Sequence, residues 1–210
     1  VRVQPTVVKA PLDIFFAVVV QRHICAKLVR MQGKPGDFLL AHPLLEDENF
    51  ERSVVLLTQW DEDGASGLII NRLSDYTLDQ ALKGTWPSWN LYFGGPVRTD
   101  SLYFVHQRPD LISGGLLVGD ALYFGGDFDA MQHAVRHDLI DEAEILFAAG
   151  YAGWTQGQLE GELDEGSWVL QPSGSCAAWW KREDLYGRLA QDWPDELKLW
   201  VNKPEVPYWN

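Results

Sequence analysis

Two histidines and a carboxylate, spaced four residues apart, are the first side chains in this sequence that could do chemistry. Asp129, His133 and His137 would share one face of a helix, because residues four apart are neighbours on a helix surface. Imidazole and carboxylate groups are ligands that zinc accepts. The alternative is the solvated side of an amphipathic helix. A zinc site normally has three or four converging protein ligands, so we favour the solvated face and expect no metal or other cofactor.

A cluster of carboxylates lies further along the chain and crowds the end of a predicted helix: Glu160, Glu162, Asp164 and Glu165. Two carboxylates can share acid–base work when burial separates their pKa values. Without such burial the cluster is a solvated acidic patch, which we favour. An enzyme, for example a hydrolase, would need a pocket that pairs Glu160 with a histidine such as His42 or His106.

A glycine-rich turn offers a third possibility, the binding of an anion or another ligand. Its members are Phe93, Gly94, Gly95, Pro96, Val97 and Arg98. Glycines let backbone N–H groups approach an anion closely, and Arg98 would add positive charge. The alternative, which we favour, is a tight turn between two strands, with Pro96 fixing its exit. The segment from Tyr151 to Trp154, beside a capped helix, is likewise either a packed corner or the wall of a pocket.

Short strands separated by glycine and proline must position these residues. We predict strands at residues 37–42, 52–60, 67–71, 91–93, 101–106, 116–118, 121–124, 144–149 and 167–171. Residues 61–64 (DEDG) form a turn, so the second and third strands make a hairpin. No regular strand–helix–strand rhythm appears. This pattern favours an α+β fold with largely antiparallel pairing.

The predicted helices begin at recognisable N-caps. Thr77 with Gln80 fits a capping box for a short helix that ends at Gly84, and Thr155 with Gln158 fits another for a helix that stops at Gly166. Residues 127–138 form a longer helix with one apolar face. That face carries Phe128, Met131, Val135 and Leu139. A last helix spans residues 175–191, with Ala178, Leu185 and Leu189 among its buried positions.

Composition indicates a globular, acidic protein. The chain has 210 residues, of which 46% are hydrophobic, and a formal net charge of −13. The charge is uneven, because residues 1–36 carry +5 and residues 37–210 carry −18. A body of that charge repels nucleic acid, so direct DNA binding is disfavoured. With only Cys25 and Cys176, a disulfide framework is excluded and a cytoplasmic location is expected.

Residues 1–30 differ from the rest of the sequence. They combine an apolar run, residues 14–20, with basic residues on both sides, and that run is too short to span a bilayer. The segment could be a signal peptide, a basic amphipathic surface segment, or an extension outside the fold. We favour an extension outside the fold, which a misplaced start of the coding sequence would explain. We expect residues 31–210 to form one domain.

The familiar catalytic and nucleotide-binding signatures are absent from the sequence. It contains no phosphate-binding G-x-x-x-x-G-K-[ST], dinucleotide-binding G-x-G-x-x-G, nucleophile-elbow G-x-S-x-G, zinc-binding H-E-x-x-H or paired C-x-x-C pattern. Ser66 reads as a hairpin residue rather than a nucleophile.

Four motifs taken together resemble one family. They are His42-Pro43-Leu44 followed by Asp47, Phe50 and the RSVV run at 52–55; Gly64, Gly67, Leu68, Asn71 and Arg72; Gly94, Gly95, Pro96 and Val97; and Gly150, Tyr151, Gly153 and Trp154 with the GQLE run at 157–160. In this order and spacing they are similar to the bacterial AlgH/YqgE proteins. The match runs from about Gly33 to about Leu189, and residues 1–30 have no counterpart in it.

The resemblance implies a compact α+β fold with a bifurcated, partly barrel-like sheet flanked by helices, in a soluble cytoplasmic protein. It supplies no catalytic residues. The family carries the label of transcriptional regulator, but no helix-turn-helix is evident here and the acidic charge opposes DNA contact, so we expect any regulatory role to be indirect. We therefore expect a non-enzymatic module that binds a protein or small ligand. The expected surface comprises Asn71, Arg72, Gly94, Gly95, Pro96, Val97, Arg98, Gly153, Trp154, Gln158 and Glu160. An uncharacterised hydrolase and a DNA-binding regulator are the alternatives.

Overall fold

The computed structural model describes residues 33–172, 184–194, 197, 198 and 201. Its strands are β1 (Phe38–Ala41), β2 (Val54–Asp61), β3 (Gly64–Ile69), β4 (Leu73–Thr77), β5 (Asn90–Phe93), β6 (Val97–His106), β7 (Leu116–Leu117), β8 (Tyr123–Phe124), β9 (Ile145–Thr155) and β10 (Trp168–Gln171). Its helices are α2 (Leu78–Ala81), α3 (Phe128–Arg136), α4 (Gln158–Asp164) and α6 (Leu185–Leu189), with 3-10 turns η2 (Glu142–Glu144) and η3 (Ala190–Asp192). The predicted N-terminal extension and both cysteines lie outside the described residues.

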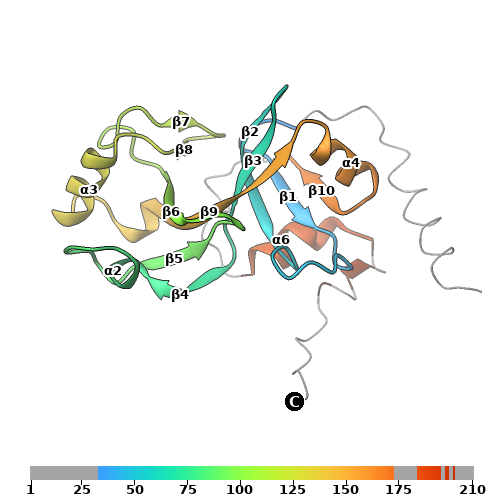
Figure 1. The fold of residues 1–210 in the computed structure, drawn as a ribbon, viewed down its shortest axis with the longest axis horizontal. Helices are drawn as coiled ribbons and strands as arrows, with labels where there is room; N and C mark the ends of the chain where they lie inside the picture. The colour runs from blue at the N-terminus through green and yellow to red at the C-terminus, as the bar shows by residue number, and fades with distance from the viewer. Residues whose placement is uncertain (1–32, 173–183, 195–196, 199–200, 202–210) are drawn as a thin grey trace, which may run out of the picture. The chain divides into compact units, whose positions relative to one another are not determined.

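The strands form one sheet in the order β10-β1-β2-β3-β9-β6-β8-β7, which does not close into a barrel. Pairing is antiparallel except between β5 and β9, so the α+β, largely antiparallel prediction is confirmed. The sheet forks at β9. Its first half pairs with β5 through residues 147–149, and its second half pairs with β3 through residues 152–155. Figure 1 shows β9 running from the fork's β5 side to its β3 side.

Apolar residues on both faces of the strands bury the sheet between three clusters of side chains. In β1, Phe38 and Leu40 belong to the cluster beside α6, whereas Leu39 and Ala41 face the cluster beside α4. Strands buried on both faces read as continuous apolar runs, as the FLLA sequence of β1 does. The third cluster lies beneath α3, whose Met131 is fully buried there.

Helix α3 confirms most of the predicted helix and corrects its apolar face. Asp127 is the N-cap and accepts a hydrogen bond from the backbone N–H of Ala130. Met131 and Val135 are buried as predicted. Phe128 and Leu139 are 45% and 48% exposed, so these two predictions are wrong. The reason for Leu139 is that the helix ends at Arg136 and Asp138 takes a left-handed backbone conformation, which turns the chain.

Other differences arise where distant pairing overrides local sequence. Strand β4 was not predicted, and β6 and β9 extend further than expected. The strand predicted at residues 144–149 continues to Thr155, because β3 pairs with residues 152–155. Gly157 replaces Thr155 as the N-cap of α4, although the Gln158 side chain still accepts from the Thr155 N–H. Residues 175–183 of the last predicted helix lie outside the described residues.

Candidate functional site

The glycine pair of the predicted turn lies at the fork of the sheet. The Gly94 N–H donates to the Ala149 carbonyl of β9, and the Gly94 carbonyl accepts from the Ile69 N–H of β3. This residue therefore links the two strands. An added Cβ on Gly94 would lie 2.2 Å from the Gly150 oxygen. On Gly95 it would lie 2.3 Å from the Tyr151 carbonyl carbon. Only glycine permits this backbone crossing, so the pair has a clear role in the fold.

Asn71 and Arg72 hold the loop that precedes β2. The Asn71 side chain accepts from the Val54 N–H at 2.7 Å and donates to the Arg52 carbonyl at 2.9 Å. The Arg72 guanidinium donates to the carbonyls of Glu48 and Asn49 and lies over the Phe93 ring. These contacts account for both side chains without a ligand.

We expect Asn71→Ala to lower the free energy of unfolding by about 2 kcal/mol, because it removes two part-buried hydrogen bonds between the side chain and the backbone. Urea denaturation of the full chain would measure the change. Asn90, an exposed asparagine whose side chain makes no described contact, provides the control Asn90→Ala. Equal stability of the two variants would contradict a structural role for Asn71.

A carboxylate holds together the corner between β9, α4 and β10. One oxygen of Glu162 accepts from the indole N–H groups of Trp154 and Trp168, each at 2.8 Å, and the other accepts from Gln158 at 2.9 Å. Phe50 packs on both indoles. Sequence reasoning placed Glu162 in a solvated patch and missed this role. Two nearby tryptophans were the available signal, since a buried indole N–H needs an acceptor.

The remaining members of the expected surface lie on several elements around β9. Pro96 and Arg98 are exposed beside the fork, and Arg98 has a left-handed backbone. Gly153 is exposed on β9, two residues beyond Tyr151, the partner of Val97, and Gln158 and Glu160 are exposed on α4, which follows the strand. The Glu160 carboxylate accepts from the indole of Trp60 at 3.0 Å. The structure therefore distributes these residues over the β5–β6 turn, β6, β9 and α4, and their function as one surface stays a prediction.

The histidines of the hydrolase hypothesis are engaged elsewhere. His106 is fully buried, and its Nδ1 accepts from the Arg108 N–H, so Nε2 carries the proton and donates to the Gly125 carbonyl. His42 Nδ1 accepts from the Leu44 N–H. Its Nε2 is buried without a hydrogen-bond partner among the described residues. No described contact joins Glu160 to either ring.

Burial lowers the pKa of both His106 and His42. Each of these two rings therefore binds its proton at a lower pH in the folded chain than in the unfolded chain, where histidine titrates near its ordinary pKa of about 6.5. We expect the free energy of unfolding to be constant above this pH and to fall as the pH drops below it, by at most about 1.4 kcal/mol per pH unit for each ring. Urea titrations from pH 7.5 to 5.5 would measure it. His106→Gln should reduce the slope, and an unchanged slope would contradict this cause.

The imidazoles on α3 are neighbours, with ring centroids of His133 and His137 4.3 Å apart. Both rings are exposed, as is Asp129. Across the described residues, however, no three metal-binding side chains converge. Two imidazoles without a third ligand fall short of the usual zinc site, and the solvated-face interpretation remains our prediction.

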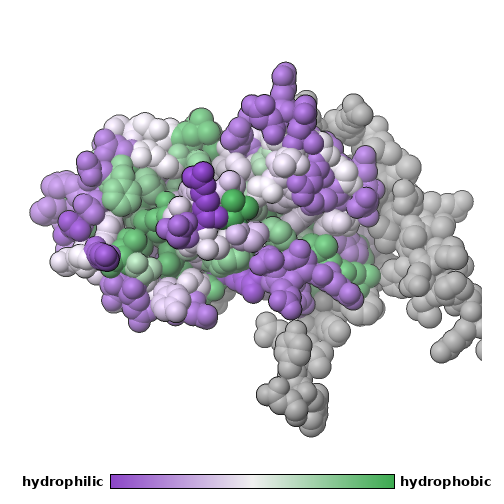
Figure 2. All heavy atoms as spheres, viewed as in Figure 1, coloured by the Kyte–Doolittle hydropathy of each residue, from purple (hydrophilic) through white to green (hydrophobic). Residues whose placement is uncertain are grey.

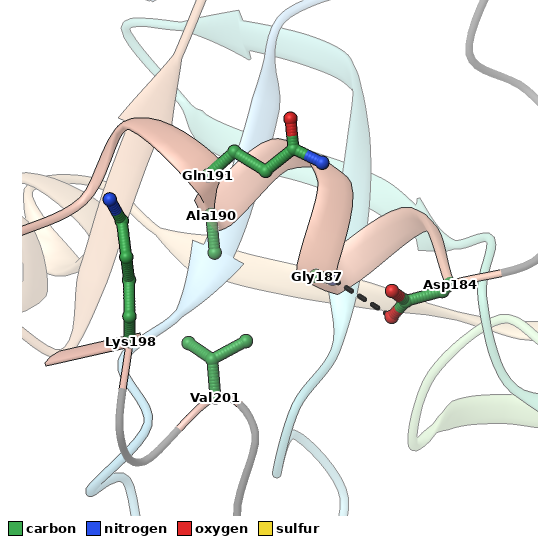
Figure 3. Close-up of a pocket in the computed structure, with 6 residues that line it drawn as sticks. All are labelled: Asp184, Gly187, Ala190, Gln191, Lys198 and Val201. Carbon is green, nitrogen blue, oxygen red and sulfur yellow. Dashed lines mark hydrogen bonds between the residues drawn. The ribbon is translucent and has the colours of Figure 1, made fainter. Parts of the chain in front are cut away.

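A hollow of about 290 Å³ lies against α6, away from the glycine turn and the α4 corner. Its lining residues are Asp184, Gly187, Ala190, Gln191, Lys198 and Val201 (Figure 3). The Asp184 carboxylate turns back to accept from the Gly187 N–H, as an N-cap does. This side chain is therefore used by the helix itself.

The fold and motifs can be compared with known proteins. A family model described as AlgH-like matches residues 38–197, which is most of the chain. The chain belongs to the AlgH-like family. A UPF0301 protein of Chlorobium limicola is 34% identical over 176 residues, covering 83% of this chain and 94% of that protein. One from Chlorobaculum tepidum is 35% identical over 179 residues, covering 84% and 96%.

Solved structures agree with this AlgH-like assignment. The AlgH protein of Pseudomonas aeruginosa matches with a TM-score of 0.55 and 34% identity, over 65% of this chain and 76% of that one. Protein DIP2367 of Corynebacterium diphtheriae matches with a TM-score of 0.59 and 23% identity, over 81% and 92%, which supports the fold alone. Within the described part of the AlgH-like chain, no helix has the length and apolar character needed to cross a membrane.

Proposed function

We propose that this AlgH-like domain is a non-enzymatic binding module that recognises a protein partner. The observation that carries the proposal is the exposure of large apolar side chains on outer strands. On β4, Leu73 is 58% and Tyr76 is 63% exposed; on β7, Leu116 and Leu117 are each 56% exposed. Within the part of the chain that the structure describes, each of these strands has a sheet neighbour on one side only. Exposed apolar groups on strand edges are typical of protein contact surfaces.

The use of the polar motif residues supports binding over catalysis. Asn71, Arg72 and Glu162 make hydrogen bonds that stabilise loops and corners. His106 has both ring nitrogens bonded inside the protein. A catalytic acid or base needs access to substrate, which a fully buried and bonded imidazole lacks.

The charge supports an indirect regulatory role in the cytoplasm rather than DNA contact. Residues 37–210 carry −18, and a protein binds the phosphate backbone mainly through basic side chains. We also propose that residues 31–210 are one domain, since the family model spans most of them. A gel shift at physiological salt that gives a specific DNA complex would overturn the indirect role.

Photo-crosslinking in cells tests the protein-binding proposal. The full chain would carry benzoylphenylalanine in place of Tyr76 or Leu117, with Gln59 and Glu165, which are exposed elsewhere, as control positions. We expect discrete protein adducts from the outer strands and none from the controls. Adducts of equal yield at all four positions, or none at any, would contradict the proposal.

A thermal-shift screen against metabolites, nucleotides and divalent metals tests a small-molecule ligand, because a ligand that binds the native state raises its melting temperature. We expect a flat screen. A saturable shift that disappears in Arg98→Ala or Glu160→Ala would instead assign a ligand to the surface expected from the sequence.

A further inference from the structure

We propose that the outer edge of β7 docks an extended peptide segment that combines apolar with basic side chains. The inference rests on the proposed protein-binding function and names the site and the chemistry of the partner. Strand β7 is the last in the sheet and pairs with β8 through Leu116–Phe124 and Leu117–Tyr123. Among the described residues no strand lies beside its other edge, so the backbone there can accept an added strand.

The apolar side chains at this edge reach solvent. Leu116 and Leu117 are consecutive, so they point to opposite sides of the strand, and each is 56% exposed. Figure 2 shows apolar residues at the surface over β7, among more polar neighbours. An added strand would cover both leucines, one on each face.

The charges around β7 define the partner. Residues 109–135 contain no lysine or arginine, but they contain four aspartates: Asp110, Asp120, Asp127 and Asp129. Arg108 pairs with Asp110. Asp120 follows the strand by three residues, and Asp127 is brought to its start, because the Asp127 N–H donates to the Ser113 carbonyl. Basic side chains of a partner would complement Asp120 and Asp127 near the two ends of β7, whereas a second copy of this acidic protein would be repelled.

The edge is held in place before any partner arrives. The Val118 N–H donates to the Leu122 carbonyl at 2.8 Å, and both side chains are fully buried in the core. Gly115, at the start of the strand, lies against the His106 ring. A preformed edge needs little ordering on binding, which favours affinity.

Selection of random twelve-residue peptides on the full-length protein tests the inference. We expect enrichment of peptides that alternate apolar residues with lysine or arginine, and weaker binding as salt rises. Leu116→Ser with Leu117→Ser should weaken binding by at least tenfold. Asp120→Asn with Asp127→Asn should weaken it severalfold, and asparagine can still serve as the N-cap at position 127. Exposed acids on α4 provide a matched control, Asp164→Asn with Glu165→Gln, which should bind as the wild type does.

The outcomes separate the site from the function. If selected peptides bind all variants equally, the β7 site is wrong while protein binding stands. Enrichment of acidic or uncharged peptides would refute the basic partner. Failure to enrich any peptide would count against the proposed function itself. Circular dichroism melts of each variant would confirm that lost binding is not lost folding.

Discussion

Gly95→Ala should leave little folded protein. Gly95 has a φ of 145°, which L side chains rarely adopt, and its added Cβ would lie 2.3 Å from the Tyr151 carbonyl carbon and 2.4 Å from the Ala152 nitrogen. Backbone atoms of a central strand cannot move aside without breaking the ladder. Overpacking and backbone strain together should cost about 3–5 kcal/mol, a large part of the stability of a typical domain. Soluble yield and urea denaturation would measure the loss.

Gly161→Ala is the matched control for Gly95→Ala. Gly161 lies inside α4, and an added Cβ there meets nothing within 4 Å. Alanine in a helix interior is favoured over glycine, so this variant should gain about 0.5–1 kcal/mol. A glycine-to-alanine substitution is thus expected to lower the free energy of unfolding at position 95 and to raise it at position 161. Comparable melting temperatures for the two variants would show that the fork tolerates a side chain.

Glu162→Ala should be the second severe substitution. It would remove the acceptor for two indole N–H groups whose tryptophans, Trp154 and Trp168, are 6% and 3% exposed. Each buried donor left unpaired costs about 1–3 kcal/mol, so we expect a loss of about 2–4 kcal/mol. Urea denaturation followed by tryptophan fluorescence would report both the stability and the environment of the indoles.

Glu162→Gln separates hydrogen bonding from charge. Its amide oxygen can still accept from both indoles, so we expect it to cost about 1 kcal/mol, the difference between charged and neutral acceptors. Glu165→Ala, at an exposed position in the same acidic cluster, should change stability little. If Gln were as damaging as Ala, the negative charge rather than the accepted hydrogen bonds would hold the corner.

Local patterns predicted the element types well but could not predict which distant segments meet. The 3.6-residue period predicted α3, and the β-branched run predicted β2, since both depend on neighbours in sequence. The role of Gly94 depends on Gly150, a residue 56 positions away that no local pattern connects to it. Strand β4 was missed because its residues are mostly exposed and give no clear alternation.

The candidate site was harder to predict than the fold. Glycine and asparagine motifs look the same in sequence whether they bind a ligand or have a structural role. Here Gly95 permits the close approach of its backbone to β9, and Asn71 holds the loop that precedes β2. The exposed leucines of β7 were predicted only as part of a strand. These leucines are exposed because β7 lies at the end of the sheet, and that position depends on the pairing order of all the strands.

The pairing of β1 with β10 has a consequence for synthesis on the ribosome. Phe38 lies opposite Gln171, so β1, the first of the described strands, receives its second neighbour only after 133 further residues have been made. Contacts this distant in sequence form slowly, and an unpaired apolar strand is prone to aggregate while it waits. Nascent chains released before residue 168 should therefore remain sensitive to protease and recruit chaperones, even when strands β2 to β9 have formed.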